Sequence, residues 1–187
     1  ILNSIDLINK YIVKSKNKAG AKILGIHIEG IFISKYGVHE EKHSIKELTI
    51  KNIEPFIKEN VILFTLAPEL DKTGEAINYL HKKNIVVSAG HTNASYKEGE
   101  IAFNKHGIEL VTHMFNAMKG ITGFNHRGSD KTNFEDLEEK LQDETKIDAE
   151  NDGIVVSILK NKNVTCMTIP DNIHVSKETI DFLIKTK

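Results

Sequence analysis

Hydrophobic residues recur along the chain at two alternating spacings. Near the N-terminus, Ile5, Ile8 and Ile12 stand three or four residues apart, which predicts an amphipathic helix that extends to about residue 16. A short apolar run at 23–28 predicts a buried strand. The same two patterns predict further strands at 61–66, 85–88, 109–112 and 164–169, and helices at 71–83, 95–105 and 176–184.

Strands and helices therefore alternate, with connections of a few residues between them. This order is typical of a parallel α/β sheet built from βα units, of which we count five. One helical stretch, 44–60, contains Pro55. Because proline lacks a backbone donor and clashes with the preceding turn, we expect two short helices or a kink there.

The composition describes an ordinary globular chain of one domain. Its 187 residues are 40% hydrophobic and 27% charged, with a net charge of −1. The sequence has neither a run of about 20 apolar residues nor a basic-then-apolar leader, so we expect no membrane segment and no secretion. The near-neutral charge argues against nucleic-acid binding. The single cysteine, Cys166, excludes an internal disulfide and favours a reducing, cytoplasmic compartment.

The segment from 130 to 152 departs from the βα pattern. It holds ten Asp or Glu and three Lys, a local charge of −7, and few large apolar residues. We interpret it as a solvated surface insertion at about 128–152, with one helix near 134–141. An acidic loop that binds a partner is the alternative interpretation, although no residue requires it.

Residues that can carry chemistry follow each predicted strand. In parallel α/β proteins, ligands bind at the C-terminal ends of the strands because side chains and helix N-termini converge there. Each of these ends has an ionisable residue, and three of them have a histidine. In chain order the residues are Glu29, Glu69, His91, His113, and Asp171 with His174.

Glu29, His91 and His113 form a set of ligands that suits a divalent metal. A carboxylate and two imidazoles bind Zn²⁺, Fe²⁺, Co²⁺ or Mn²⁺, and three protein ligands leave a position open for water, whose pKa falls to about 7 on zinc. Because the three stand on separate strands, their spacing cannot establish the site. A His91 satisfied by backbone groups and a His113 within the core remain the alternatives. We interpret His27 as a hydrogen-bonded residue of its strand.

An anion site is indicated after the fourth strand. Asn116 and Ala117 follow that strand and precede two glycines, so free backbone N–H groups are expected there. Arg127 comes ten residues later and is the single arginine among 25 basic residues. Its planar, charged fork suits bidentate phosphate binding, and an arginine left on the surface by chance is an equal alternative.

Five segments in order give the chain a resemblance to a known family. They are 25–30 (GIHIEG), 66–69 (LAPE), 87–94 (VSAGHTNA), 112–118 (THMFNAM) and 171–175 (DNIHV). Together they resemble signature segments of the N-acetylglucosamine-6-phosphate deacetylases, from about residue 22 to residue 174. This family belongs to the metal-dependent amidohydrolase superfamily. The resemblance implies an α/β fold that is a partial TIM (β/α)8 barrel, with about five βα units in residues 1–187.

The resemblance also implies roles for individual residues. Glu29, His91 and His113 match the family's divalent-metal ligands. The residues that match substrate-binding positions are Val38, His39, Asn116, Ala117, Arg127, Asp171, Asn172, Ile173 and His174. Among these, Asn116, Ala117 and Arg127 match the phosphate site, and His174 is the candidate for stabilising the oxyanion. The implied reaction hydrolyses N-acetylglucosamine 6-phosphate, a small amino-sugar phosphate, to glucosamine 6-phosphate and acetate.

The chain departs from the family pattern at several positions. Ile31 replaces a proline, Asn172 replaces a glycine, and the segment that holds Arg127 differs in sequence and spacing. The family's catalytic aspartate is expected beyond residue 187, so we expect residues 1–187 alone to be inactive and the full-length protein to form a homodimer. Two alternatives remain: an amidohydrolase that acts on a different amide, and a non-catalytic remnant or binding module that retains affinity for metal and sugar phosphate.

Overall fold

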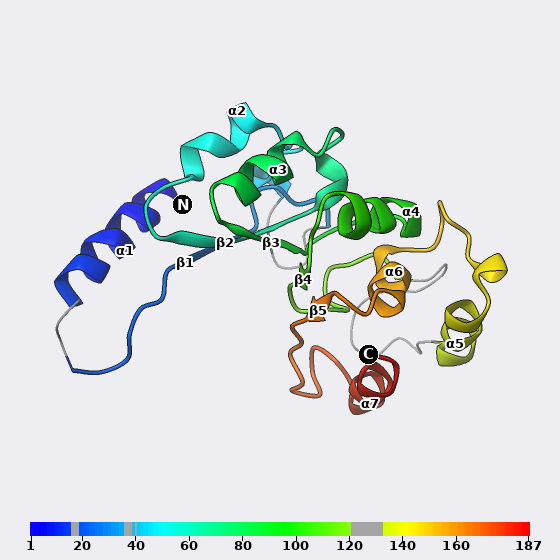
Figure 1. The fold of residues 1–187 in the computed structure, drawn as a ribbon. Coiled ribbons are helices and arrows are strands. Elements are labelled where there is room, and N and C mark those ends of the chain that lie inside the picture. The colour runs from blue at the N-terminus through cyan, green and yellow to red at the C-terminus, as the bar shows by residue number, and fades with distance from the viewer. Residues whose placement is uncertain (16–18, 36–38, 40, 121–132) are drawn as a thin grey trace.

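Five parallel strands form the centre of the molecule (Figure 1). The computed structural model describes residues 1–15, 19–35, 39, 41–120 and 133–187. The strands stand in the sheet in their order along the chain, and each pairs in parallel with the next. They are β1 (Ile26–Glu29), β2 (Val61–Leu66), β3 (Val86–Ala89), β4 (Leu110–Val111) and β5 (Thr165–Cys166). The predicted parallel α/β sheet is confirmed, and the ends of its strands lie along one edge.

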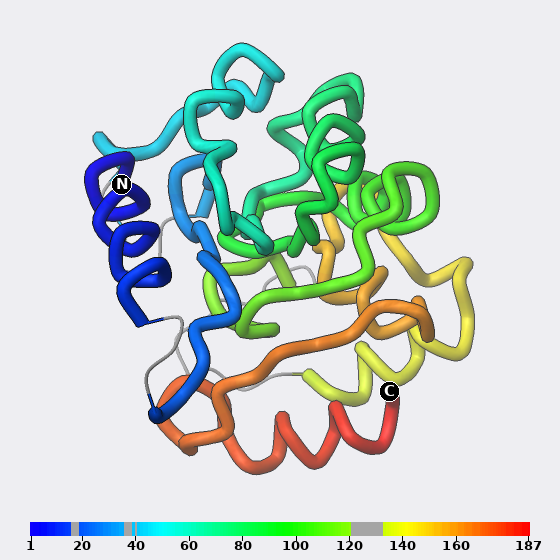
Figure 2. The backbone as a smooth tube through the Cα atoms, turned by 60° about the vertical axis from the view of Figure 1, so that its left-hand side comes forward, coloured from blue at the N-terminus to red at the C-terminus, as the bar shows by residue number. Residues whose placement is uncertain are grey.

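In the part of the chain that the structure describes, seven α-helices lie around the sheet, and the backbone trace in Figure 2 shows them in an arc. They are α1 (Leu2–Ser15), α2 (Ile50–Ile53), α3 (Glu75–Lys82), α4 (Tyr96–Glu100), α5 (Phe134–Gln142), α6 (Ile154–Lys160) and α7 (Lys177–Thr186). Short 3-10 turns lie at η1 (Glu41–His43), η2 (Glu54–Phe56), η3 (Pro68–Leu70) and η5 (Glu144–Lys146), and a π-helical turn, η4 (Ile101–Lys105), extends α4. Pro55 stands in η2 directly after α2, so the expected interruption is confirmed.

Two helices, α6 and α3, differ from the prediction. Helix α6 lies inside a stretch for which no element was predicted, because six of its seven residues are buried and its sequence lacks a polar face. Helix α3 begins at Glu75 rather than at residue 71. Asp71 nevertheless satisfies the start of this helix, since its carboxylate accepts the backbone N–H groups of Gly74 and Ile77 at 2.8 and 2.9 Å.

The sheet has one apolar face and one polar face. The apolar face packs under the helices, and its buried residues are Ile26, Ile28, Phe64, Leu66, Val87, Ala89 and Val111. On the other face, His27 Nε2 lies 2.7 Å from Thr65 Oγ1, which lies 2.7 Å from Thr112 Oγ1. Thr112 also meets Ser88 Oγ at 2.7 Å. His27 is therefore a hydrogen-bonded residue of its strand, as the sequence indicates.

The acidic segment is anchored by a buried ion pair. The expected helix is present as α5, and the Nζ of Lys140 lies 2.8 Å from Oδ1 of Asp152, with these residues 7% and 0% exposed. The backbone carbonyl of Asp152 accepts the N–H of Tyr96, the first residue of α4. The segment was expected to be solvated, and this is wrong for Lys140 and Asp152, which are buried. Within the described residues, no helix has the length and apolar character that a membrane crossing needs.

Candidate metal centre

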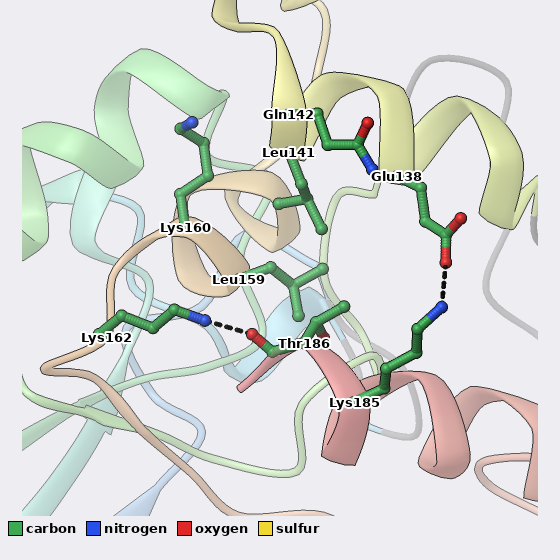
Figure 3. A pocket seen from close by; sticks show the side chains of 8 residues that line it. All are labelled: Glu138, Leu141, Gln142, Leu159, Lys160, Lys162, Lys185 and Thr186. Atoms are coloured by element: carbon green, nitrogen blue, oxygen red, sulfur yellow. Dashed lines mark hydrogen bonds and ion pairs between the residues drawn. The ribbon is translucent and has the colours of Figure 1, made fainter.

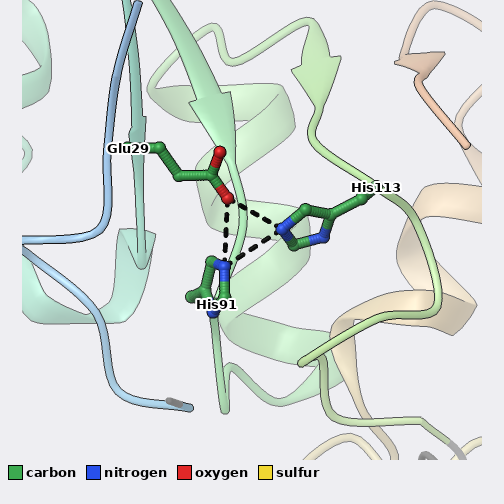
Figure 4. Close-up of side chains that lie close together, drawn as sticks. All are labelled: Glu29, His91 and His113. Atoms are coloured by element: carbon green, nitrogen blue, oxygen red, sulfur yellow. Dashed lines mark hydrogen bonds and ion pairs between the residues drawn. The ribbon is translucent and has the colours of Figure 1, made fainter. Parts of the chain in front are cut away.

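Three side chains from the ends of β1, β3 and β4 converge on one point (Figure 4). The Oε1 atom of Glu29 lies 3.0 Å from Nε2 of His91 and 2.9 Å from Nε2 of His113. The two Nε2 atoms lie 3.0 Å from each other. One carboxylate oxygen and two imidazole nitrogens thus form a nearly equilateral triangle, which we call the triad.

The backbone orients the His91 ring. Its Nδ1 lies 3.0 Å from the backbone carbonyl of Lys35, so Nδ1 carries a proton and donates it. This assignment leaves the lone pair of a neutral ring on Nε2, which points at the other two triad atoms. A metal-ligating histidine has its second nitrogen held by a carbonyl or carboxylate in this way.

The triad fits a divalent metal better than it fits a set of hydrogen bonds. If both imidazoles donated to Oε1 of Glu29, two protonated Nε2 atoms would lie only 3.0 Å apart. His91 would then be protonated on both nitrogens and carry a positive charge, although it is 4% exposed. Donor atoms about 2.1 Å from a common ion lie about 3 Å apart when the angle at the ion is near 90°. The distances and the chemistry of the three donors therefore agree with a shared ion.

Without an ion, the two imidazoles stabilise the ionised form of Glu29. Their Nε2 atoms lie within hydrogen-bond distance of its carboxylate, and His113 first and His91 second hold the pKa of the Glu29 carboxyl well below its ordinary value of 4.5. Burial acts to lower the pKa of the His113 imidazole, but the hydrogen bond and the charge of Glu29 outweigh burial and raise it above 6.5. Glu29 is therefore ionised, as a metal ligand must be.

Both triad histidines have an uncommon backbone conformation. His91 has φ of 50° and His113 has φ of 35°, which lie in the left-handed region that residues with a Cβ rarely occupy. Phe115 and Ala117, with φ of 74° and 48°, continue this pattern after β4. Such conformations cost about 1–3 kcal/mol each and cluster at functional sites, where surrounding contacts enforce them.

His39 lies beside the triad, as its expected substrate-contacting role requires. Its ring packs edge-on against His91, with 4.6 Å between the centroids. Gly30 makes room for it, since a Cβ at Gly30 would stand 2.6 Å from Cε1 of His39. Gly30 also has φ of 100°, so both space and backbone require glycine there. Val38, the other expected member of this pair, lies outside the described residues.

The loop after β4, where free backbone N–H groups are expected, does not present one at Asn116. It is hydrogen-bonded to the loop after β3, since the N–H of Thr92 donates to the carbonyl of Ala117 at 3.0 Å. The N–H of Asn116 already donates to the carbonyl of His113 at 2.9 Å, whereas its buried Nδ2 has no partner among the described residues. Nζ of Lys35 donates to the carbonyl of Met118 at 2.8 Å. Arg127 lies outside the described residues, so its predicted position is not tested.

The loop after β5 orients His174 through Asp171. The Asp171 carboxylate accepts from the backbone N–H and from Nδ1 of His174, at 2.8 and 2.6 Å, and from the N–H of Ile173 at 2.9 Å. These bonds, from the His174 backbone first, lower the pKa of Asp171 to about 2. Asn172 has φ of 61°, which fits its place where a glycine is expected. Among the described residues, the hydrogen bonds of His174 join it to Asp171 of this loop and not to the triad.

Glu69 has a larger part in the site than the sequence indicates. The sequence places it at the end of β2 but assigns it no role. In the structure its carboxylate accepts from Thr92 Oγ1 at 2.6 Å, from the N–H of Asn93 at 2.8 Å, and from Ser34 Oγ. The sequence offered one indication of this role: Thr92 and Asn93, directly after His91, both have hydrogen-bond donors that a nearby carboxylate can accept.

A pocket of about 310 Å³ lies among α5, α6 and α7, and it shares no residue with the triad (Figure 3). Its lysines are already bonded: Lys185 to Glu138 at 3.0 Å, Lys160 to Glu144 at 2.9 Å, and Lys162 to the carbonyl of Thr186. Two of these three lysines are thus paired with carboxylates, and the third donates to a neutral carbonyl.

Comparison with known proteins finds similarity to N-acetylglucosamine-6-phosphate deacetylases. No protein-family model matches the chain. It is 39% identical over 122 residues to the N-acetylglucosamine-6-phosphate deacetylase of Rattus norvegicus, a match that covers 62% of the chain and 29% of that protein. The corresponding protein of Haemophilus influenzae is 36% identical over 136 residues, which are 68% of the chain and 33% of that protein. The chain thus spans about a third of the length of these relatives.

A solved structure gives the same result for the fold. The crystal structure of N-acetylglucosamine-6-phosphate deacetylase from Thermotoga maritima superposes with a TM-score of 0.72 at 27% identity, over 100% of the chain and 43% of that protein. The five-stranded sheet with its helices therefore corresponds to part of a barrel, and the expected partial-barrel fold is confirmed.

Proposed function

Since the chain is related in sequence and fold to part of the N-acetylglucosamine-6-phosphate deacetylases, we propose that the protein containing it hydrolyses N-acetylglucosamine 6-phosphate to glucosamine 6-phosphate and acetate. The observation that supports this most is the convergence of Glu29, His91 and His113 within 3.0 Å. These three residues would hold a divalent ion, and such an ion activates water and polarises the amide carbonyl.

The other site residues have complementary tasks in this proposal. Arg127, Asn116 and Ala117 bind the phosphate and so fix the distance from the sugar to the triad. Because the N–H of Asn116 is bonded to His113, phosphate binding there requires the loop to exchange that bond, while the unpartnered Nδ2 is free to donate.

His39 and the 171–174 loop complete the site. His39 packs on His91 and contacts the sugar. His174 donates to the oxyanion through Nε2, because its Nδ1 is held by Asp171. Val38 and Ile173 line the substrate. We further propose a homodimer, and a cytoplasmic location in keeping with the single cysteine.

The test is a hydrolysis assay on the protein that contains this chain. Metal-depleted protein is expected to release glucosamine 6-phosphate and acetate after Zn²⁺ or Co²⁺ is added, and His91→Ala is expected to abolish the release. Arg127→Ala should raise KM for the phosphorylated sugar and leave any hydrolysis of unphosphorylated N-acetylglucosamine unchanged. Absence of acetate release by metal-loaded protein would exclude the function.

A further inference from the structure

Glu69 occupies the one strand end between β1 and β4 that contributes nothing to the triad. The triad members follow β1, β3 and β4, and β2 lies between β1 and β3 in the sheet. β2 is followed by Ala67 and the short η3 turn, in which Glu69 is half-buried. Its carboxylate lies between the segment that follows Glu29 and the turn that carries His91.

The Glu69 carboxylate joins these two segments directly. Oε2 accepts from the hydroxyl of Thr92 at 2.6 Å, and Oε1 accepts from the hydroxyl of Ser34. The backbone N–H of Asn93 is shared between Oε1 of Glu69 and Oγ of Ser34, at 2.8 Å each. Asn93 Nδ2 also donates to the carbonyl of Ser34 at 3.0 Å. Glu69 is thus at the centre of a network that connects segment 34–35 to residues 92–93.

The same two segments determine the position of His91. The carbonyl of His91 accepts the N–H groups of Ser34 and Lys35, at 3.0 and 2.9 Å. The His91 ring donates from Nδ1 to the carbonyl of Lys35. His91 therefore contacts segment 34–35 through both its backbone and its ring, and its left-handed φ of 50° has to be maintained by such contacts.

From this geometry we propose that Glu69 is a positioning residue of the metal centre, which holds the His91 turn against segment 34–35 and so directs Nε2 of His91 at the ion. The inference rests on the proposed function, because it requires an ion at the triad. Glu69 itself contributes no atom to the triad. It acts through Ser34, Thr92 and Asn93.

Only a carboxylate satisfies all three donors at once. An ionised carboxylate is purely an acceptor, and here it accepts two hydroxyl protons and one N–H. A glutamine of the same size would present an NH₂ group to one of these donors. Glu69→Gln therefore loosens the network without creating a cavity, and the ring of His91 loses part of its support.

Zn²⁺ affinity of metal-depleted protein, measured by calorimetric titration, tests this role. Glu69→Gln is expected to weaken Zn²⁺ binding roughly 10- to 100-fold, the usual effect of losing a residue that orients a metal ligand. The visible spectrum of the Co²⁺-loaded variant is expected to change as well, because it reports ligand geometry. Glu75→Gln, an exposed carboxylate six residues further on, is the matched control and should change neither.

The possible results separate the inference from the proposed function. Zn²⁺ affinity equal to that of the unmodified protein in a folded Glu69→Gln variant would overturn the inference alone. If the unmodified protein binds no Zn²⁺, the metal centre and the inference both fail. If circular dichroism shows Glu69→Gln to be unfolded, Thr92→Val replaces it: weaker Zn²⁺ binding supports the role of the network, and unchanged binding overturns it.

Discussion

Nε2 of His91 and Nε2 of His113 lie 3.0 Å apart, and both lie within 3.0 Å of the same oxygen of Glu29. Two protonated nitrogens repel at this distance, so the two imidazoles cannot both donate to this oxygen. Lone pairs directed at a common point are what a metal ion requires. A shared metal ion accounts for two histidines with strained backbones that lie side by side at the ends of β3 and β4.

Loss of one triad imidazole is expected to abolish stoichiometric metal binding. His113→Ala removes one of three ligands and leaves two, which cannot hold a divalent ion tightly. Bound Zn²⁺ per chain, measured by elemental analysis after dialysis, should fall from about one equivalent to near zero. His43→Ala, in an exposed turn, is the control and should retain the metal. Equal metal content in the two variants would contradict the assignment.

Metal binding at the triad is expected to weaken as pH falls. The ion must displace the proton of His113. Burial acts to lower the pKa of this ring, but the hydrogen bond to Glu29 outweighs burial and raises the pKa above 6.5. Below that pKa the proton competes with the ion. The carboxyl of Glu29 does not compete near neutral pH because its pKa is lowered. Calorimetric titration in buffers of different ionisation enthalpy should show proton release and lower affinity at about pH 6 than at about pH 8.

The stability of the metal-free protein is expected to decrease as pH rises, whereas its affinity for metal increases. A raised pKa means that His113 contributes stability that is fully present below 6.5 and is lost as pH rises through its folded value. Melting temperatures of metal-depleted protein should therefore decline slightly over the range in which metal affinity increases. Parallel trends in the two measurements would contradict the coupling of His113 to Glu29.

Gly30→Ala is expected to destabilise the protein and to displace His39. The left-handed backbone alone costs about 1–3 kcal/mol, and the new Cβ would stand 2.6 Å from the His39 ring. Gly20→Ala is a matched control, since Gly20 also has positive φ but has nothing within 4 Å of a Cβ. Urea unfolding should give a larger loss for Gly30→Ala. Equal losses would mean that His39 does not pack against Gly30.

The ion pair of the acidic segment is expected to matter more than its surface charges. Lys140→Met leaves the fully buried Asp152 carboxylate without its lysine, which should lower the free energy of unfolding by about 3–5 kcal/mol. Lys146→Met removes an exposed pair with Glu139 and should cost less than about 1 kcal/mol. Similar unfolding midpoints for the two variants would show that the buried pair does not stabilise the segment.

Local sequence patterns predicted two kinds of element: those buried on one face only, and those whose ends are marked by residues that interrupt the pattern. Strand β2 occupies residues 61–66 as predicted, because a β-branched, apolar run ends there at Ala67 and Pro68. Helix α6 could not be predicted in this way: Ile154, Val156 and Ile158 are all buried, and a helix covered on all sides has no polar stripe. No local pattern indicates that His106 is buried, yet it is 8% exposed, with its ring against Gly74.

The site required the fold as well as the sequence. Glu29 is 62 residues from His91 and 84 from His113, so their convergence depends on the strands being adjacent in chain order. The residue types predicted metal chemistry, and the sheet supplies the geometry. The role of Glu69 could not be predicted, since it depends on how two loops meet beside the triad.

Anomalous X-ray diffraction from crystals of the protein grown with Zn²⁺ tests the central claim most directly. The account predicts one strong anomalous peak at about 2.0–2.2 Å from Oε1 of Glu29, Nε2 of His91 and Nε2 of His113. A peak held by other side chains, or none at the triad, would contradict it.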